Sequence, residues 1–351
     1  MSIEIFQFPE KASESDLVEL LIELGYESGE NLFWHGPEGT KHFFWADTAD
    51  FKSTSGVDAS VFPLDDKGKK AWKVTSCKWV LRTRSSIWAS SFDKDFQNHT
   101  VRTVRKKFGG RFYNDHFGHN RYIQFEKEQS TPASRGLFSI REQLKGDLDS
   151  LEYSLPEEKV QFLDTPKGII DENNDPMGLL AFSKQLDPSR VVYNALVTFL
   201  IAGIEYFFRE SFEILLKYDE NAKLKLNQSS RKVPFADASA LARGEFHLES
   251  IVSSWYSFQN LDSINKAYSE NLQIDIWKTL RRRKKIRKKL PLLTDALNNL
   301  IGARHGVVHH FSLDRNLSRE DFLNLIHLVK TIINVMSKEF EQKLGIKFGP
   351  G

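Results

Sequence analysis

The chain has 351 residues, of which 40% are hydrophobic and 27% are charged. This length and composition allow two ordinary domains, and they exclude global disorder, collagen-like sequence and low-complexity sequence. Cys77 is the only cysteine, so an intrachain disulfide and a four-cysteine zinc site are excluded, and we expect a reducing compartment.

The first residues contain neither the basic nor the apolar segment of a secretory signal. The most apolar stretch, between Arg190 and Glu205, has fourteen residues, whereas a bilayer-spanning helix needs about 18–20. We therefore expect a soluble cytoplasmic protein with no membrane partner.

The net charge of +2 is unevenly distributed along the chain. Residues 1–50 carry −9, residues 51–150 carry +8, residues 151–200 carry −4, and residues 251–300 carry +6. Two basic blocks separated by an acidic one predict two surfaces that can meet an anionic polymer. Ordinary variation of surface charge is the alternative explanation.

Residues 1–150 are predicted to form an α+β domain. Short runs rich in Phe, Trp, Val and Ile, bounded by Gly, Asp and Ser, are typical of strands. These runs are Ile3–Phe8, Asn31–His35, His42–Asp47, Trp72–Arg84 and Arg121–Glu126. A helix is expected after Ser13, where Asp16 gives a capping signal, and a second is expected over about Asp93–Lys107, ending at two glycines.

The rest of the chain divides into a linker and a helical region. Residues 151–186 hold three prolines and a turn-rich acidic segment, which predicts a linker. Residues 187–345 predict an all-α bundle, in which Asp187 and Pro188 start an apolar central helix. Further helices are predicted at about 237–258, 262–285, 293–309 and 318–343.

The segment 297–311 carries the most chemical information. Apolar residues at 297, 300, 301, 308 and 311 form one helical stripe, and Arg304 lies on it, although a charged guanidinium facing a core is costly unless it is paired or meets an anion. His305 and His309 are one turn apart. Glycines at 302 and 306 cost helix stability, which indicates close approach of another backbone, from either a neighbouring helix or a symmetry mate.

The residues of this segment allow two interpretations that involve no RNA chemistry. Arg304 and His309 could form a buried polar network that fixes the packing of the helix. His305 and His309 have the spacing of two zinc ligands on one helix, but Gly306 stands where a metallopeptidase would have its glutamate.

Arg304–His309 resembles the Arg-(polar)-x-x-x-His signature of the HEPN superfamily. As in that superfamily, the motif precedes a final long amphipathic helix, and the segment from Phe199 to Phe212 resembles the leading helix of prokaryotic members. The resemblance covers about residues 187–345. It implies an all-α HEPN-like helical bundle after the α+β N-terminal domain, for which no resemblance is recognised.

Active HEPN members are endoribonucleases that use neither metal nor cofactor and that pair their motifs across a dimer. By resemblance, Arg304 and His309 are the catalytic pair, with His305 in support and RNA as substrate. Histidine can transfer protons near neutral pH, and arginine can hold phosphate oxygens. The resemblance also implies a homodimer or a HEPN-like partner, and a role as an effector in prokaryotic defence or as a toxin. A non-catalytic interaction or nucleic-acid-binding module is the alternative.

Other charged residues could support this chemistry. Glu205 and Arg209 are one turn apart on the central helix, and an ion pair between them, or from Glu205 to Arg304, is the simpler prediction, with a supporting catalytic role as the alternative. A dense basic run precedes the motif and predicts contacts with RNA phosphates, or otherwise a solvated helix end. Its members are Arg281, Arg282, Arg283, Lys284, Lys285, Arg287, Lys288 and Lys289.

In the N-terminal domain, basic residues between Arg102 and Arg111 precede a segment with Asp115, His116 and His119. We interpret that segment as a polar hairpin turn, and a metal-dependent nuclease site is the alternative. The domain has no assigned role, and a trigger, a protein partner or nucleic acid could bind it.

Overall fold

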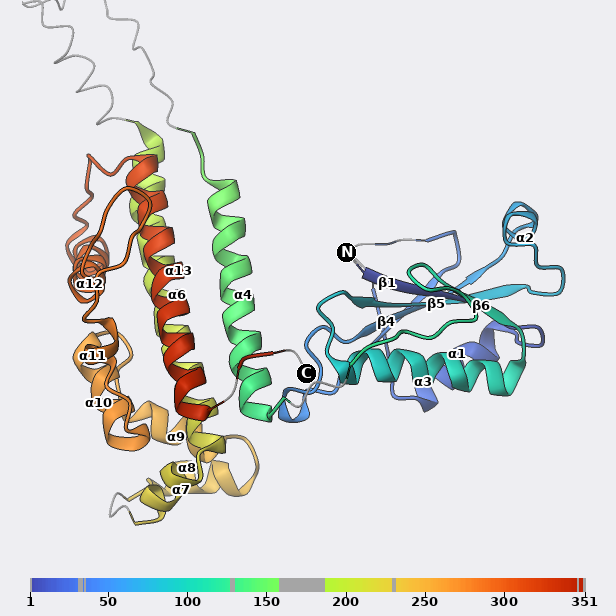
Figure 1. Ribbon diagram of the computed structural model, residues 1–351, viewed down its shortest axis with the longest axis horizontal. Coiled ribbons are helices and arrows are strands. Elements are labelled where there is room, and N and C mark those ends of the chain that lie inside the picture. The colour runs from blue at the N-terminus through green and yellow to red at the C-terminus, as the bar shows by residue number, and fades with distance from the viewer. Residues whose placement is uncertain are drawn as a thin grey trace, which may run out of the picture. The chain divides into compact units, whose positions relative to one another are not determined.

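The computed structural model describes residues 2–30, 34, 36–126, 130–157, 187–228, 232–345 and 347–349. The chain divides into two compact units (Figure 1). One comprises residues 1–139 with 348–351, and the other comprises residues 140–347.

The first unit is built on an antiparallel sheet with the strand order β2-β3-β4-β5-β1-β6-β7. The strands are β1 (Ser2–Phe8), β2 (Glu27–Gly29), β3 (Lys41–Trp45), β4 (Val57–Pro63), β5 (Trp79–Ser86), β6 (Arg111–Asn114) and β7 (Gly118–His119). In register, Ile5 of β1 pairs with Thr83 of β5 and with Asn114 of β6. The alternation of half-buried and buried residues over most of β1 follows from the two-residue repeat of a strand.

Helices α1 (Glu14–Glu23) and α3 (Ser91–Phe108) lie on one face of this sheet (Figure 1). Both start with a capping box, from Ser13 to Asp16 and from Ser90 to Asp93, in which side chains satisfy the free N–H groups of the first turn. Leu17 and Leu21 of α1 join the buried cluster formed with β4 and β5. The unit also contains the short helices η1 (Ala49–Phe51) and α2 (Asp66–Trp72).

Two predicted strands differ from the structure, and most of a third lies outside the described residues. The run from Trp72 is split, because Trp72 ends α2 and the strand starts at Trp79. Residues 121–126 form no strand, because the side chain of Asn98 bonds both the N–H and the C=O of Ile123, at 2.9 and 3.0 Å, in place of a neighbouring strand. The predicted strand Asn31–His35 lies outside the described residues except for Trp34, which is not in a strand.

The second unit is all-helical over its described residues. It contains α4 (Pro132–Ser154) from Ile140 onward, α6 (Pro188–Tyr218), α7 (Glu220–Asn227), α8 (Phe235–Ala242), α9 (Leu248–Ser254), α10 (Leu261–Leu272), α11 (Ile276–Leu280), α12 (Leu293–His310) and α13 (Arg319–Leu344). The predicted domain boundary at residue 150 therefore falls inside α4. Most of the predicted linker, residues 158–186, lies outside the described residues.

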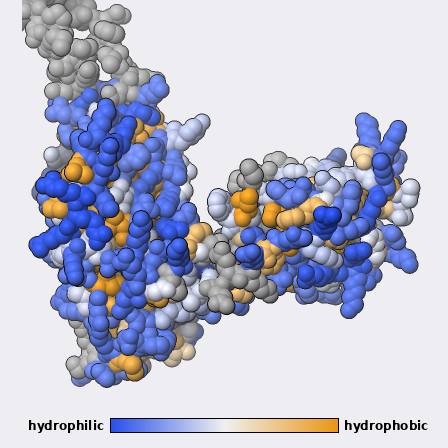
Figure 2. Space-filling model, in the orientation of Figure 1, coloured by the Kyte–Doolittle hydropathy of each residue, from blue (hydrophilic) through white to orange (hydrophobic). Residues whose placement is uncertain are grey.

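The central helix is α6, which contacts α9, α10, α12 and α13. Asp187 caps its first turn and Pro188 follows, as predicted. By length and composition α6 would also qualify as a membrane-spanning helix, because its apolar run continues beyond the single charge of Glu205, so the fourteen-residue estimate from sequence was too short. The core helix of a bundle has the same properties, and the visible face of this unit is mainly hydrophilic (Figure 2).

Two predicted helices are shorter than the sequence indicated. The one predicted over 237–258 is divided into α8 and α9, and Gly244 between them has a φ of +72°, which a helix cannot hold. The one predicted over 262–285 is divided into α10 and α11 and ends at Leu280. The basic run therefore lies outside any helix.

Candidate functional site

The candidate site lies on the C-terminal half of α12. The first turns of this helix are anchored in the bundle, where Leu293, Leu297 and Leu300 are buried. The helix ends at Phe311, which adopts a left-handed conformation and donates its N–H to the carbonyl of Gly306. As predicted, the motif precedes the long final helix α13, which starts at the cap Ser318.

The second half of the apolar stripe is uncovered in the described structure. Val308 is 50% exposed and Phe311 is 82% exposed, so the prediction that the whole stripe faces the core is wrong for these two residues. The helical repeat identifies a face, but it does not say how far along the helix another element covers that face. An exposed apolar end of this kind is typical of a surface that meets another molecule.

The two glycines of α12 lie on open surface. A Cβ atom built at Gly302 has no described atom within 4 Å, and one built at Gly306 meets only the Cβ of Ser312, at 3.8 Å. In the part of the chain that is described, no neighbouring helix therefore explains these glycines. Close approach by a second molecule stays a prediction.

Three histidine rings gather at the end of α12. The ring centroids of His305 and His309 are 4.5 Å apart, and those of His305 and His310 are 5.4 Å apart. All three residues are exposed, while Arg304 is half-buried. The structure thus places the imidazoles where a ligand from solvent can reach them, with the guanidinium closer to the bundle.

Glu205 on α6 lies within electrostatic range of Arg304, but the predicted ion pair between the two side chains is not formed in the described structure. Burial raises the pKa of the Glu205 carboxyl above its ordinary value, while the charges of Arg304 and Arg209 act to lower it. Its Oε1 atom is buried without a hydrogen-bond partner in the described structure. The predicted close ion pair with Arg209 is not formed, because that guanidinium lies over the ring of Phe258, 5.7 Å from its centroid.

The basic run forms a hairpin, which we call the basic hairpin and define as residues 281–292. Two isolated bridges close it, Arg283 with Leu292 and Ile286 with Lys289. Ile286 is 4% exposed and anchors the loop, whereas the eight basic residues are exposed. The alternative prediction of a solvated helix end is wrong, since the segment is held as a hairpin.

The first turn of α13 contacts the tip of the basic hairpin. Lys288 approaches Glu320 at 3.9 Å and Lys289 approaches Asp321 at 3.4 Å. These exposed pairs contribute little to stability, and an RNA phosphate can compete for the same cations.

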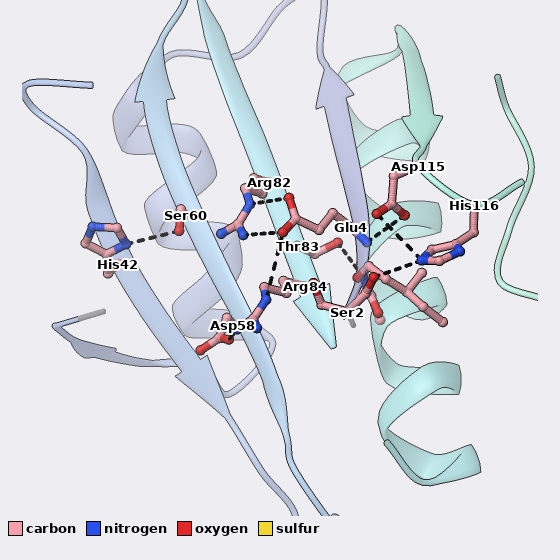
Figure 3. Close-up of polar contacts among 12 residues, drawn as sticks. Ser2, Glu4, His42, Asp58, Ser60, Arg82, Thr83, Arg84, Asp115 and His116 are labelled. Atoms are coloured by element: carbon pink, nitrogen blue, oxygen red, sulfur yellow. Dashed lines mark hydrogen bonds and ion pairs between the residues drawn. The ribbon is translucent and has the colours of Figure 1, made fainter. Parts of the chain in front are cut away.

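Asp115 and His116 fasten the first strand of the N-terminal unit (Figure 3). Asp115 accepts a hydrogen bond from the N–H of Glu4 at 2.9 Å, and Nε2 of His116 bonds the carbonyl of Ser2 at 2.9 Å. His119 of β7 pairs with Tyr113 of β6 at the edge of the sheet. This geometry fits the predicted turn, and the described residues contain no group of three potential metal ligands.

The sequence analysis missed an ion network on the same sheet (Figure 3). Arg82 is 2% exposed and forms two hydrogen bonds to Glu4, at 2.7 and 2.9 Å, beneath the ring of Trp34. The hydrogen bond from Arg82 lowers the pKa of Glu4. Arg84 links Glu4 to Asp58, at 3.8 and 3.2 Å. These residues occupy alternate positions on adjacent strands, so only the strand pairing reveals the network.

One protein-family model matches the region of the second unit. Residues 177–342 match the RiboL-PSP-HEPN family model, and this range contains the motif and the helices from α6 to α12 with most of α13. The fold is thus an α+β unit followed by a helical region that matches a HEPN domain. No curated protein and no solved structure matches the chain.

Proposed function

Because its C-terminal helical region matches a HEPN family, we propose that this protein is a metal-independent endoribonuclease in which Arg304 and His309 act on the RNA backbone. The observation that carries the proposal is the position of the motif. Arg304 is half-buried beside the carboxyl of Glu205, and His309 is exposed in a cluster of three imidazoles. A fixed cation and a group that transfers protons are the two parts that RNA cleavage requires.

The proposed reaction uses the RNA's own 2′-hydroxyl. His309 removes its proton, the 2′-oxygen bonds to phosphorus, and the bond from phosphorus to the 5′-oxygen breaks. The leaving 5′-oxygen takes up a proton from an acid, and the products are a 2′,3′-cyclic phosphate and a 5′-hydroxyl. Arg304 stabilises the charge on the phosphate oxygens during this step.

A second copy of the chain would complete the site. A base and an acid are both needed, and the face of α12 that carries Gly302 and Gly306 is open to another molecule. At about 100° per residue His309 lies on the same face, so pairing through it would bring two motifs together.

The test is cleavage of single-stranded RNA by the full-length protein, with and without EDTA. We expect unchanged activity in EDTA and products that end in 2′,3′-cyclic phosphate, while Arg304→Ala and His309→Ala each remove most of the activity and keep the helical circular dichroism signal. Loss of cleavage in EDTA, or full activity of both variants, contradicts the mechanism.

The basic hairpin favours a second candidate function, RNA binding without cleavage, because its exposed cations do not depend on the motif. RNA binding without cleavage in the same assay would favour this candidate.

We extend the main proposal to an effector of a prokaryotic defence or toxin system. The support is the layout, in which a separate α+β unit precedes the HEPN-type unit. In that role the N-terminal unit would bind a trigger or a protein partner.

A further inference from the structure

An open cleft of about 650 Å³ lies where α10, α11 and the start of the basic hairpin meet. Its lining residues are Asn265, Asp275, Trp277, Lys278 and Arg281. The volume is within the range of ligand pockets, and the lining combines one aromatic ring, two cations and two groups that can hydrogen-bond to a base.

Local hydrogen bonds fix the backbone that carries the ring and one of the cations. Oδ1 of Asn265 accepts the N–H groups of Ile276 and Trp277, at 2.8 and 3.2 Å. The N–H of Arg281 donates to the carbonyl of Trp277 at 2.9 Å, which places Arg281 one turn after the ring. Trp277 is half-buried, so part of its ring remains accessible.

Two polar atoms of the cleft remain available for a ligand. Asp275 uses its Oδ1 to accept the N–H of Lys278 at 2.9 Å, but its Oδ2 has no hydrogen bond among the described residues. Nδ2 of Asn265 likewise has no hydrogen bond among the described residues. A carboxylate oxygen and an amide N–H are the acceptor and donor that read the edge of an unpaired base.

We infer that this cleft is a nucleotide subsite for single-stranded RNA, in which a base stacks on Trp277 while Lys278 and Arg281 hold the adjacent phosphates. The inference rests on the proposed function, because it takes RNA as the substrate. Bases stack on aromatic side chains regardless of sequence, and cations beside the ring follow the backbone. Asp275 adds a preference for a base that presents an N–H donor.

The subsite is connected to the motif by α12. The carbonyl of Arg282 accepts the N–H of Leu293 at 3.1 Å, so the start of the basic hairpin lies at the first turn of this helix. Arg304 is eleven residues further on, about 17 Å along the helix axis. A single strand that followed α12 from its first turn to Arg304 would span about five stacked nucleotides at ~3.4 Å each. The cleft therefore binds a nucleotide remote from the cleaved bond and contributes affinity to the enzyme.

The experiment measures binding of a fluorescein-labelled single-stranded RNA to full-length protein by anisotropy at several salt concentrations, in a His309→Ala background that prevents cleavage. We expect Trp277→Ala to raise the Kd about tenfold without changing the salt slope, and Trp277→Phe to retain most of the affinity. Lys278→Gln and Arg281→Gln should each raise the Kd and reduce the slope by about 0.7.

Lys338→Gln, at an exposed position on α13, is the control for the change of charge. Because Trp277 is half-buried, the charge reversals Lys278→Glu and Arg281→Glu give a second measurement that does not depend on removing the ring. If Trp277→Ala binds like its parent and the two cation variants behave like the control, the subsite is refuted.

The outcome separates the subsite from the enzyme. Cleavage by the wild-type protein together with unchanged binding by these variants would refute the subsite alone. Weakened binding by Trp277→Ala, when the wild-type protein does not cleave, would refute the proposed function alone.

Discussion

The imidazole rings of His305 and His309 lie on successive turns of α12 with their centroids 4.5 Å apart and their planes at 44°. At this distance one ring restricts the position of the other, so His305 can orient His309 from the same helix. His310 lies beside His305, with its ring at 5.4 Å. Single substitutions can therefore assign a role to each ring.

The first prediction concerns the three histidines. His309→Ala should lower the single-turnover rate by about 100-fold or more, the usual contribution of proton transfer by a side chain. His305→Ala should cost about tenfold and His310→Ala less than twofold, because orientation is worth less than the proton transfer itself. Rates at saturating RNA are the measurement. A larger loss for His310→Ala than for His309→Ala would mean that the proton-transfer residue has been misassigned.

The second prediction uses the open surface at Gly302. A Cβ atom at position 302 meets no described atom within 4 Å, and leucine is a better helix former by up to about 1 kcal/mol, so Gly302→Leu should not lower the free energy of unfolding. Its side chain should block close approach of a second copy, so association and RNA cleavage should weaken together. Analytical ultracentrifugation and the cleavage assay measure the two effects.

Ala238→Leu is the matched control, since it introduces the same side chain at an exposed position on α8 rather than on α12. We expect it to associate and cleave like the wild-type protein. A wild-type chain that is monomeric at micromolar concentration and still cleaves RNA would contradict the composite site.

The third prediction concerns the basic hairpin. Replacing Arg282, Lys285 and Lys288 with Gln should raise the Kd for RNA and flatten its dependence on salt, because fewer counterions are released on binding. The single-turnover rate at saturating RNA should change little, since Arg304 and His309 remain. Binding and rate are measured on the same RNA at several salt concentrations.

Lys232, Lys266 and Lys338, all exposed in the same unit, provide a control triple variant with the same change of charge. It should shift the salt dependence less than the hairpin variant. If the hairpin variant loses its saturating rate but keeps its affinity, the run belongs to the active site or to the dimer interface.

The fourth prediction follows from the buried carboxyl of Glu205. Its raised pKa means that the folded protein holds this proton more tightly than the unfolded chain does, so stability falls as the pH rises from the ordinary value of ~4.3 through the raised pKa. Glu205→Gln cannot ionise. The Tm of Glu205→Gln minus that of the wild-type protein should therefore increase as the pH rises from about 4.3 to the raised pKa, and it should stay constant at higher pH.

Thermal unfolding is followed by circular dichroism between pH 4 and pH 8, in steps of about one pH unit. This series tests the direction in which the difference in Tm changes with pH. Glu220→Gln, at an exposed carboxylate on α7, serves as the control and should show no comparable trend. A difference in Tm between Glu205→Gln and wild type that does not depend on pH would show that ionisation of Glu205 does not oppose folding. Cleavage by the variant then reports whether the charge beside Arg304 is needed in the reaction.

The sequence determined the features of this protein that arise within a few residues of one another. The capping signals at Ser13, Asp187 and Ser318 depend on contacts inside one turn, and each starts a helix in the structure. The helical repeat and the order of residues also place Arg304 and His309 on the helix before the last one, which is why the HEPN resemblance could be recognised.

Only the tertiary structure decided which residues from distant parts of the chain meet. The side chain of Asn98 replaces a strand partner at Ile123, and the cleft at Trp277 depends on how α10 and α11 pack. The exposure of Phe311 likewise depends on where the neighbouring helices stop. Local propensity carries no information about such contacts, because their free energy comes from burial and from hydrogen bonds between groups that only the folded chain brings together.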